Sequence, residues 1–296
     1  MTAPTRATPA GRAYLDLRRK ARQDHRPVDE LMQLYVLESF LARMAATRFA
    51  DRFVLKGGVL LAAFGERRPT RDIDLQAQAF DNDPAAIPAA ITEIAAVSLD
   101  DGVVFDTVTA TAEVIRDEDR HQGVRVSMTA SLATARPGFH VDVSVGDPIN
   151  PAPQTVHLPR ILGGELAVRG YPLAMAYAEK IVTAISRGTT STRWRDFADM
   201  YMLARHHAID GAELSTSIRE VSRHRDAQLV PLSQVLADYG GIGQVRWEAW
   251  RRRQRLDDRL PGQFSDVVAA VVAFADPAIA GLAESQSWDP AAGVWG

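Results

Sequence analysis

Residues 56–74 read KGGVLLAAFGERRPTRDID, a run that joins a glycine pair to an Asp-x-Asp motif. Gly57 and Gly58 lack Cβ atoms, so backbone N–H groups beside them can approach a phosphate at the start of a helix. Asp72 and Asp74 lie two residues apart on a predicted strand, where their carboxylates project from the same face. Carboxylates this close repel each other unless a cation lies between them, and Mg²⁺ bound to a nucleoside triphosphate is the natural one. The stretch therefore predicts a phosphate-binding turn beside a metal site.

The parts of this stretch follow a fixed order: glycine turn, short helix, basic turn, acidic strand. Each motif alone is weak, because a glycine pair is usually an ordinary turn and Asp-x-Asp occurs by chance. In this order they resemble the first motif of the nucleotidyltransferase superfamily, specifically the AbiEii/MenT toxins of bacterial toxin–antitoxin (type IV-like) and phage-defence systems. On this resemblance Asp72 and Asp74 are catalytic and metal-binding. Lys56, Thr70 and Arg71 join the two glycines as nucleotide-binding residues.

The composition excludes several other classes of protein. The chain has 296 residues, of which 46% are hydrophobic, and this is enough for one large or two modest domains. Cys is absent, which excludes disulfides, thiolate metal sites and cysteine nucleophiles. No apolar run approaches the ~20 residues needed to span a bilayer, and the start lacks the apolar region of a signal peptide. We therefore expect a cytoplasmic protein without membrane contact.

The periodicity of the apolar residues divides the chain into three parts. Residues 1–27 form a basic segment that starts without periodicity and is expected to be partly disordered. Residues 28–165 mix predicted helices, at 28–47 and 84–97, with predicted strands, at 53–55, 103–115, 123–132 and 139–143. Residues 166–296 have the pattern of helices. We predict an α/β fold: a nucleotidyltransferase-type mixed sheet with flanking helices, followed by a helical C-terminal lobe and separated from it by a cleft.

A third acidic residue, Asp142, lies on the predicted strand FHVDV at residues 139–143. In the superfamily that the chain resembles, an acid on a later strand joins the first two. Three carboxylates can hold two Mg²⁺ ions, and the third acid is then also the candidate general base. The alternative is a surface acid on the polar face of a strand. His140 lies on the same face, and we interpret it as a packing or hydrogen-bonding residue rather than as a ligand.

Two predicted helices of the second lobe carry a further charged set. Residues 177–180 read YAEK, and residues 193–201 read RWRDFADMY. AbiEii/MenT proteins have a helical Glu-Lys followed by an Arg-Asp-x-x-Asp signature, so the resemblance assigns Lys180 and Asp196 as catalytic. An ammonium could hold the β- and γ-phosphates and stabilise the departing pyrophosphate, and Arg193 could add a phosphate contact. The alternative is a salt-bridge lattice between adjacent helices.

These residues lead to one expected function and two rivals. We expect a Mg²⁺-dependent nucleotidyltransferase toxin (2.7.7 type), with Mn²⁺ as the alternative ion, in which an acceptor hydroxyl attacks the α-phosphate of an NTP. The resemblance implies a pyrimidine donor, the 3′ end of tRNA or another RNA as acceptor, a block of translation, and a cognate antitoxin encoded nearby. One rival is transfer to a small molecule, such as an antibiotic. The other is a regulatory protein that binds nucleotide without catalysis.

Basic residues gather in two places, although the net charge is −3. They lie at residues 1–26 and at residues 246–259, where Trp247 and Trp250 are interleaved. Local basic patches can bind RNA phosphates even on a mildly acidic protein. We therefore expect the N-terminal cluster or Arg251–Arg253 to contact RNA. The alternative is that both are solvated helix faces.

Thr70 is the candidate for regulation. It lies in the basic turn two residues before Asp72, so its hydroxyl is expected near the metal and the γ-phosphate. A phosphate added there would bring roughly −1.5 to −2 charges into the triphosphate site and exclude the nucleotide. We hypothesise that Thr70 is phosphorylated, by a cognate antitoxin or by the toxin's own nucleotide chemistry. The alternative is that Thr70 only caps the turn.

Overall fold

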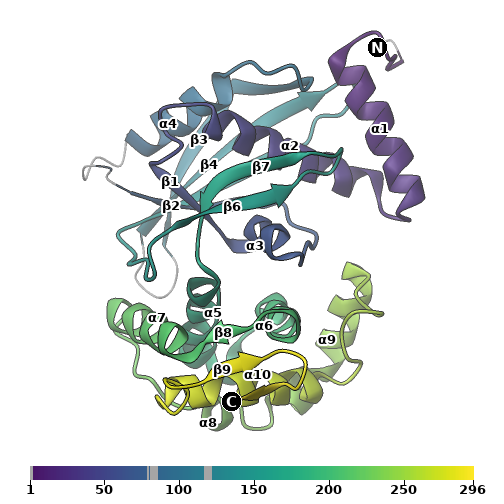
Figure 1. Cartoon of the computed structure of the whole chain (residues 1–296). Coiled ribbons are helices and arrows are strands. Elements are labelled where there is room, and N and C mark those ends of the chain that lie inside the picture. Colours follow the sequence, from purple (N-terminus) through teal and green to yellow (C-terminus); the bar gives the residue numbers. More distant parts are fainter. Residues whose placement is uncertain (1–2, 79, 81–85, 117–121) are drawn as a thin grey trace. The chain divides into compact units, whose positions relative to one another are not determined.

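The computed structural model describes residues 3–78, 80, 86–116 and 122–296, and Figure 1 shows its helices and strands. The chain divides into two compact units. The first comprises Met1–Gly146 and Gln154–Gly170, and the second comprises Asp147–Pro153 and Tyr171–Gly296. The chain therefore passes between the units at three points. The last of these follows Gly170, rather than residue 165 as the sequence pattern indicated.

The centre of the first unit is a seven-stranded sheet with strand order β3-β4-β5-β2-β1-β7-β6. β2 runs parallel to β5 and β1 runs parallel to β7, while the other neighbours are antiparallel. The strands are β1 (Phe53–Lys56), β2 (Asp72–Ala77), β3 (Val103–Arg116), β4 (Gln122–Leu132), β5 (Gly138–Val145), β6 (Gln154–Pro159) and β7 (Glu165–Gly170). Because β7 pairs with β6 and β1, the first unit extends to Gly170. The predicted α/β fold with a mixed sheet is confirmed.

Helices flank this sheet (Figure 1). They are α1 (Pro9–Gln23), α2 (Val28–Ala45), α3 (Gly57–Leu60), which continues as a 3₁₀ turn at Leu61–Phe64, and α4 (Ala86–Ala96). The predicted helix at 28–47 is α2, which packs on the sheet through Phe40; its ring lies 5.9 Å from that of Phe105 and 5.7 Å from that of Phe139. The predicted helix at 84–97 corresponds to α4, with residues 84 and 85 outside the described residues.

The N-terminal segment is more ordered than its composition indicates. Thr8 caps α1, because its hydroxyl oxygen accepts a hydrogen bond from the Gly11 N–H at 3.1 Å. Ala13, Leu17 and Ala21 recur every four residues and are buried, so α1 has one apolar face to pack against its neighbours. The expectation of disorder therefore does not hold for Pro9–Gln23, and this helix belongs to the first unit.

The second unit is built mainly from helices, as predicted. They are α5 (Leu173–Arg187), α6 (Trp194–His206), α7 (Gly211–His224), α8 (Leu232–Val235), α9 (Tyr239–Gln254) and α10 (Phe264–Ile279), with a 3₁₀ turn at Gly188–Thr190. Aromatic rings fill its core, where Trp194, Tyr239 and Phe264 lie within 5.7 Å of one another, measured between ring centres. None of the helices in the described residues is long and apolar enough to cross a membrane.

A small sheet closes the C-terminal end of this unit, and no periodicity in the sequence indicated it. Its strands are β8 (Ile209–Asp210), β9 (Ser287–Asp289) and β10 (Val294–Trp295), in the order β10-β9-β8. Two indole N–H groups hold it to the helices: Trp288 Nε1 donates to Ala204 O at 2.6 Å, and Trp295 Nε1 donates to Phe274 O at 3.0 Å. The C-terminal residues are therefore part of the folded unit.

Candidate active site

Parallel pairing of β2 with β5 gathers the acidic residues of the first unit. In the register of β2 with β5, Asp72 lies opposite His140, and Asp74 lies opposite Asp142. The two pairs are two residues apart on each strand, so the four side chains project from one face of the sheet. Ile73 and Val141, which lie between these residues on the two strands, point to the other face and are fully buried. The alternation read from the sequence thus places the polar groups on one surface.

Three of these side chains lie close enough to share a cation. Ligand atoms of Asp72, His140 and Asp142 all lie within 4.8 Å of one another. His140 Nε2 is 3.7 Å from Asp72 Oδ2. All three residues are half-buried, so a hydrated ion can reach them. His140, which the sequence indicated as a packing or hydrogen-bonding residue rather than a ligand, lies inside the acidic cluster.

Asp142 has a cationic partner that the sequence did not indicate. Arg125 on β4 lies opposite Asp142 in the antiparallel pairing of β4 with β5. Its Nε and Nη2 donate to Asp142 Oδ1 and Oδ2, both at 2.7 Å, and these hydrogen bonds raise the pKa of Arg125. Accepting a proton would break one of these bonds, which weakens the prediction of Asp142 as general base. Each oxygen still keeps a lone pair for a cation.

The glycine pair begins beside the acidic strand. Gly57 has φ +66°, and a Cβ added there would lie 1.9 Å from Asp74 Oδ2. Glycine is therefore required for two reasons, the left-handed backbone and the close approach of the carboxylate. Lys56 ends β1 and lies opposite Asp74 in the register of β1 with β2. The predicted phosphate-binding turn and the predicted metal-binding strand are thus direct neighbours.

The basic turn before β2 packs against the second glycine. Thr70 Oγ1 donates to Asp72 Oδ1 at 2.8 Å. A Cβ at Gly58 would lie 2.8 Å from the same hydroxyl oxygen and 3.2 Å from Arg68 Nη1. Thr70 and Arg68 are buried, while Arg71 is exposed. The Thr70 hydroxyl therefore orients the Asp72 carboxylate, and Gly58 leaves the space in which it does so.

A buried carboxylate on α2 holds the same turn in place. Glu38 Oε1 accepts from Arg67 Nη1 at 2.7 Å, and both Glu38 oxygens accept from the Ile161 N–H, at 3.1 and 2.9 Å. Burial raises the pKa of Glu38, and the Arg67 charge acts in the opposite direction. Arg67 also donates to Pro159 O. The turn is thus held to α2 and to the last residue of β6.

The second unit holds the other predicted site residues on two neighbouring helices, α5 and α6. Lys180 Nζ lies 3.0 Å from Asp196 Oδ1 and 2.9 Å from Asp199 Oδ2. The Asp199 side chain is fully buried, and those of Lys180 and Asp196 are 12% and 11% exposed. Arg193 Nη1 lies 3.5 Å from Asp196 Oδ2. Two cations therefore balance two buried carboxylates.

Asp196 stays ionised in this surrounding. Its burial acts to raise its pKa, but the charges of Lys180 and Arg193 outweigh that effect, so the pKa of Asp196 lies below its ordinary value. Beyond the ion pair with Arg193, Asp196 Oδ2 has no hydrogen-bond partner in the described residues.

Glu179, which precedes Lys180 on α5, has other partners. Its carboxylate lies 3.3 Å from the Tyr171 hydroxyl and 3.8 Å from Arg225 Nη2.

The structure therefore groups the predicted residues by unit. The first unit holds Lys56, Gly57, Gly58, Thr70, Arg71, Asp72, Asp74 and Asp142, and the second holds Lys180, Arg193 and Asp196. Sequence reasoning missed Arg125 and Glu38 and gave His140 a minor role. Aligning the predicted strands 123–132 and 139–143 in register would have found Arg125. No local pattern marks Glu38, because its partners are Arg67 and the backbone at residue 161.

A comparison with protein families identifies the class of protein to which the chain belongs. The model of a nucleotidyltransferase family matches residues 39–284, which is most of the chain. The protein is therefore a nucleotidyltransferase. It belongs to the family described as nucleotidyl transferase AbiEii toxin, type IV TA system. Membership makes it a toxin of a toxin–antitoxin system, with an antitoxin as partner, and implies the use of an NTP and a divalent metal.

Other comparisons give more distant similarity. No curated protein matches the chain. JHP933 from Helicobacter pylori is 14% identical with a TM-score of 0.48, and the match covers 86% of this chain and 94% of that one. A candidate nucleotidyltransferase from H. pylori is 13% identical with a TM-score of 0.48, covering 86% of this chain and 96% of that one.

Proposed function

We propose that this toxin transfers a nucleoside monophosphate from an NTP to an RNA acceptor, with Mg²⁺ as the metal. The observation that carries the proposal is the cluster of Asp72, His140 and Asp142, whose ligand atoms lie within 4.8 Å of one another. Asp74 and the glycine turn at Gly57 adjoin it. A metal site next to a phosphate-binding turn is what nucleotidyl transfer requires.

The donors of the cluster fit a hard divalent cation. Carboxylate oxygens, which Asp72 and Asp142 supply, are the ligands that Mg²⁺ prefers, and the imidazole of His140 suits Mn²⁺ better. When bound, the ion would neutralise part of the triphosphate charge and polarise the phosphate under attack. Arg125 already compensates one carboxylate of the cluster. The remaining negative charge is what a cation would balance.

The residues of the first unit then position the reacting groups. The acceptor hydroxyl oxygen forms a bond to the α-phosphorus, the bond from that phosphorus to the bridging oxygen breaks, and pyrophosphate leaves with the electron pair. The hydroxyl proton passes to a carboxylate of the cluster. Asp72 is better placed for this than Asp142, because Arg125 engages both oxygens of Asp142. Lys56, Arg71 and the backbone at Gly57 and Gly58 would bind the phosphates.

The acceptor and the donor base follow from the family resemblance. We take the acceptor to be the 3′ end of tRNA and the donor to be a pyrimidine triphosphate. Modification of that end would block aminoacylation and therefore translation, which accounts for toxicity. A tRNA acceptor places the reaction in the cytoplasm, and the cognate antitoxin would be encoded nearby.

We assign Lys180 and Asp196 to the same reaction. The ammonium of Lys180 is held by two carboxylates, so its donors are oriented before any substrate binds. It would stabilise the charge that develops on pyrophosphate, with Arg193 as a second phosphate contact. Asp196 would orient the lysine. The balance of charge in this cluster also fits a purely structural role, and measuring stability beside activity would separate that role from catalysis.

We keep Thr70 as a control point. Its hydroxyl donates to Asp72, so a phosphate there would replace a hydrogen bond with repulsion between anions. Because Thr70 is 9% exposed, a kinase would need the turn to open. Thr70→Glu should lose transfer while Thr70→Ser keeps it. A fully active Thr70→Glu protein, or the absence of a phosphorylated peptide in cells with the antitoxin, would leave Thr70 as a turn residue only.

The decisive experiment supplies each α-labelled NTP in turn with Mg²⁺ and total tRNA. We expect label on tRNA with a pyrimidine NTP and none with Asp72→Ala. Label on small molecules in an RNA-free cell extract would favour the antibiotic-type rival. Tight NTP binding without pyrophosphate release under all conditions would favour the regulatory rival. Repeating the reaction with chelator and with Mn²⁺ tests the metal.

A further inference from the structure

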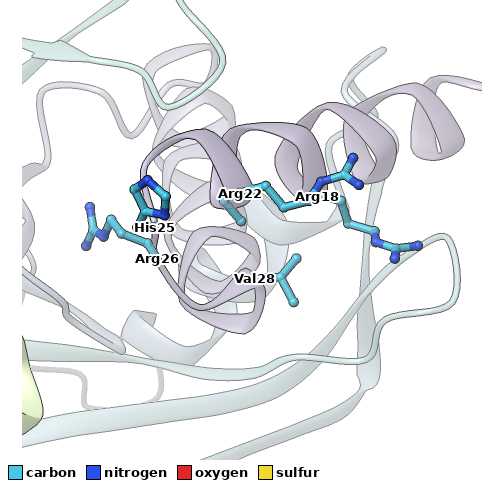
Figure 2. Close-up of a pocket in the computed structure, with 6 residues that line it drawn as sticks. Arg18, Arg22, His25, Arg26 and Val28 are labelled. Carbon is cyan, nitrogen blue, oxygen red and sulfur yellow. The ribbon is translucent and has the colours of Figure 1, made fainter.

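A basic pocket lies at the end of α1, N-terminal to the residues that match the family. Its volume is about 400 Å³, and it is lined by Arg18, Ala21, Arg22, His25, Arg26 and Val28. Figure 2 shows the guanidinium groups of Arg18 and Arg22 on one side of the pocket, and His25 and Arg26 on the other. The pocket is thus lined by basic side chains and by the apolar residues Ala21 and Val28.

Two of these arginines have no acidic partner among the residues that the structure describes. Arg18 and Arg22 are exposed, lie four residues apart on α1, and form no ion pair within the described residues. Arg19 and Lys20, between them in the sequence, each have an acidic partner, at 3.2 and 3.0 Å. Like charges at this spacing disfavour a helix. The helix dipole favours a cation in the last turn, which accounts for Arg22 but not for Arg18 one turn earlier.

The spacing of the arginines fits a chain of phosphates better than a single anion. Four residues of α-helix rise about 6 Å, so Arg18 and Arg22 present donors at successive steps along one line. Arg26 continues the series beyond the end of the helix and is held by Glu30. The Arg18 guanidinium lies 5.9 Å from the centre of the Tyr14 ring, which leaves its N–H donors for another group.

The second basic cluster is less available for such a role. Arg251 on α9 is 15% exposed, donates to Leu260 O at 2.9 Å and pairs with Asp257 at 3.4 Å. Arg252 lies 3.7 Å from Glu248, and Arg253 is exposed without an ion pair in the described residues. Two of these three arginines therefore have acidic partners inside their own unit, whereas Arg18 and Arg22 have none in the part of the chain that the structure describes. The comparison therefore favours the pocket on α1 as the phosphate-binding surface.

We infer that the α1 pocket binds the phosphodiester backbone of the RNA acceptor. The inference rests on the proposed function, and it names the surface that holds the RNA away from the reacting 3′ end. The donors are arginines that face phosphates, so recognition there is independent of base sequence. Removing them should weaken binding to every RNA and should leave NTP binding unchanged.

The test compares two double variants of the same helix. Arg18→Gln with Arg22→Gln removes the unpaired charges of the pocket. Arg12→Gln with Arg19→Gln removes the same charge from α1 outside the pocket. Affinity for fluorescently labelled total tRNA is measured across salt concentrations without NTP, and Kd for each NTP is measured separately. Circular dichroism checks that α1 is retained in both proteins.

The pocket variant should bind tRNA roughly tenfold more weakly, and its salt dependence should fall by about 0.7–0.9 in slope for each lost contact. The control should keep the wild-type slope. Equal slopes in the two variants, or no tRNA binding by the wild-type protein, would overturn the inference. Inorganic pyrophosphate that binds the pocket without competing with tRNA would overturn it too. Transfer of label to tRNA is scored separately, so its absence refutes the proposed function and not the binding surface.

Discussion

The two charged clusters of this toxin differ in how completely their charges are balanced. On the sheet of the first unit, Asp72, Asp74 and Asp142 share one face with Arg125, and the metal-compatible residues there are half-buried. On α5 and α6 the carboxylates of Asp196 and Asp199 are buried against Lys180. The acidic residues of the first cluster are half-buried, so water can reach them. The second is close to neutral and closed.

This difference predicts that mutations in the two clusters change the stability of the fold by different amounts. A carboxylate removed from a half-buried surface that several acids share relieves repulsion between them and offsets part of the hydrogen bonding that is lost, so the fold should lose little stability. A partner removed from a buried, balanced cluster leaves an unpaired charge in a poorly hydrated place, so the fold should suffer. Loss of activity therefore means different things in the two clusters, and stability has to be measured beside it.

The largest effect is expected for Asp72→Ala and Asp74→Ala. Each should reduce nucleotidyl transfer at least about 100-fold, since an electrostatic contact of this kind is worth that much in an active site. The Tm should fall much less than in Lys180→Ala, since Asp72 is half-buried and its removal costs the hydrogen bond from Thr70. Asp51→Ala, which removes an exposed acid of the same unit, is the control. Wild-type transfer by a folded Asp72→Ala protein would refute the metal site.

Lys180→Ala should lose both transfer and stability. Breaking a buried ion pair by removing one partner costs about 3–5 kcal/mol, which urea denaturation can measure. The combined variant Lys180→Met, Asp196→Asn, Asp199→Asn removes the charges together and should recover most of that loss.

The activity of the combined variant decides the role of this cluster. If Lys180 and Asp196 act in the reaction, the recovered protein stays inactive. If the recovered protein transfers label at a normal rate, the cluster is structural only, and the assignment taken from the family resemblance is wrong.

Arg125→Gln should strengthen metal binding moderately, whereas the variants above lose function. Arg125 competes with a cation for Asp142, and an ion pair this exposed is worth about 0–1 kcal/mol. Its removal should tighten Mg²⁺ binding by up to about fivefold, as measured by calorimetry. Unchanged Mg²⁺ affinity, with Asp142→Asn equally without effect, would remove Asp142 from the metal site.

The smallest expected effect is on stability in acid. The folded-state pKa of Asp196 lies below its ordinary value of 3.8, so its ionised form stabilises the fold above that value. The contribution should fade as the pH drops from about 3.8 through the lower folded value. The unfolding free energy of wild type should therefore fall more steeply there than that of Asp196→Asn. Parallel pH profiles for the two proteins would contradict the shift.

The sequence predicted those parts of the site that depend on local spacing. The two-residue period of a strand placed Asp72 and Asp74 on one face, and the same period placed Asp142 beside His140. The glycine pair was found because adjacent residues without Cβ atoms before a short helix are also a local signal. Arg125 could not be found in this way, because it meets Asp142 only through the pairing of β4 with β5. Glu38 was missed because its partners are distant along the chain.

The fold was predicted at the level of elements and less well at their edges. The helix at Pro9–Gln23 was hidden by its polar composition, since only every fourth residue is apolar and buried. The boundary at residue 165 was drawn at a glycine turn, but that turn joins β6 to β7, which are paired strands of one sheet. A turn signal marks the end of a strand and does not reveal what the next strand pairs with.

The three passages of the chain between the units have a genetic consequence. The first unit ends only at Gly170, because β7 pairs with β1, the strand that leads into Gly57. A gene cut at the first passage, after Gly146, would therefore encode a sheet without the neighbour of that strand. No single cut before Gly170 yields a complete first unit. A cut after Gly170 completes the first unit but leaves Asp147–Pro153 outside the second, so no single cut yields both units whole.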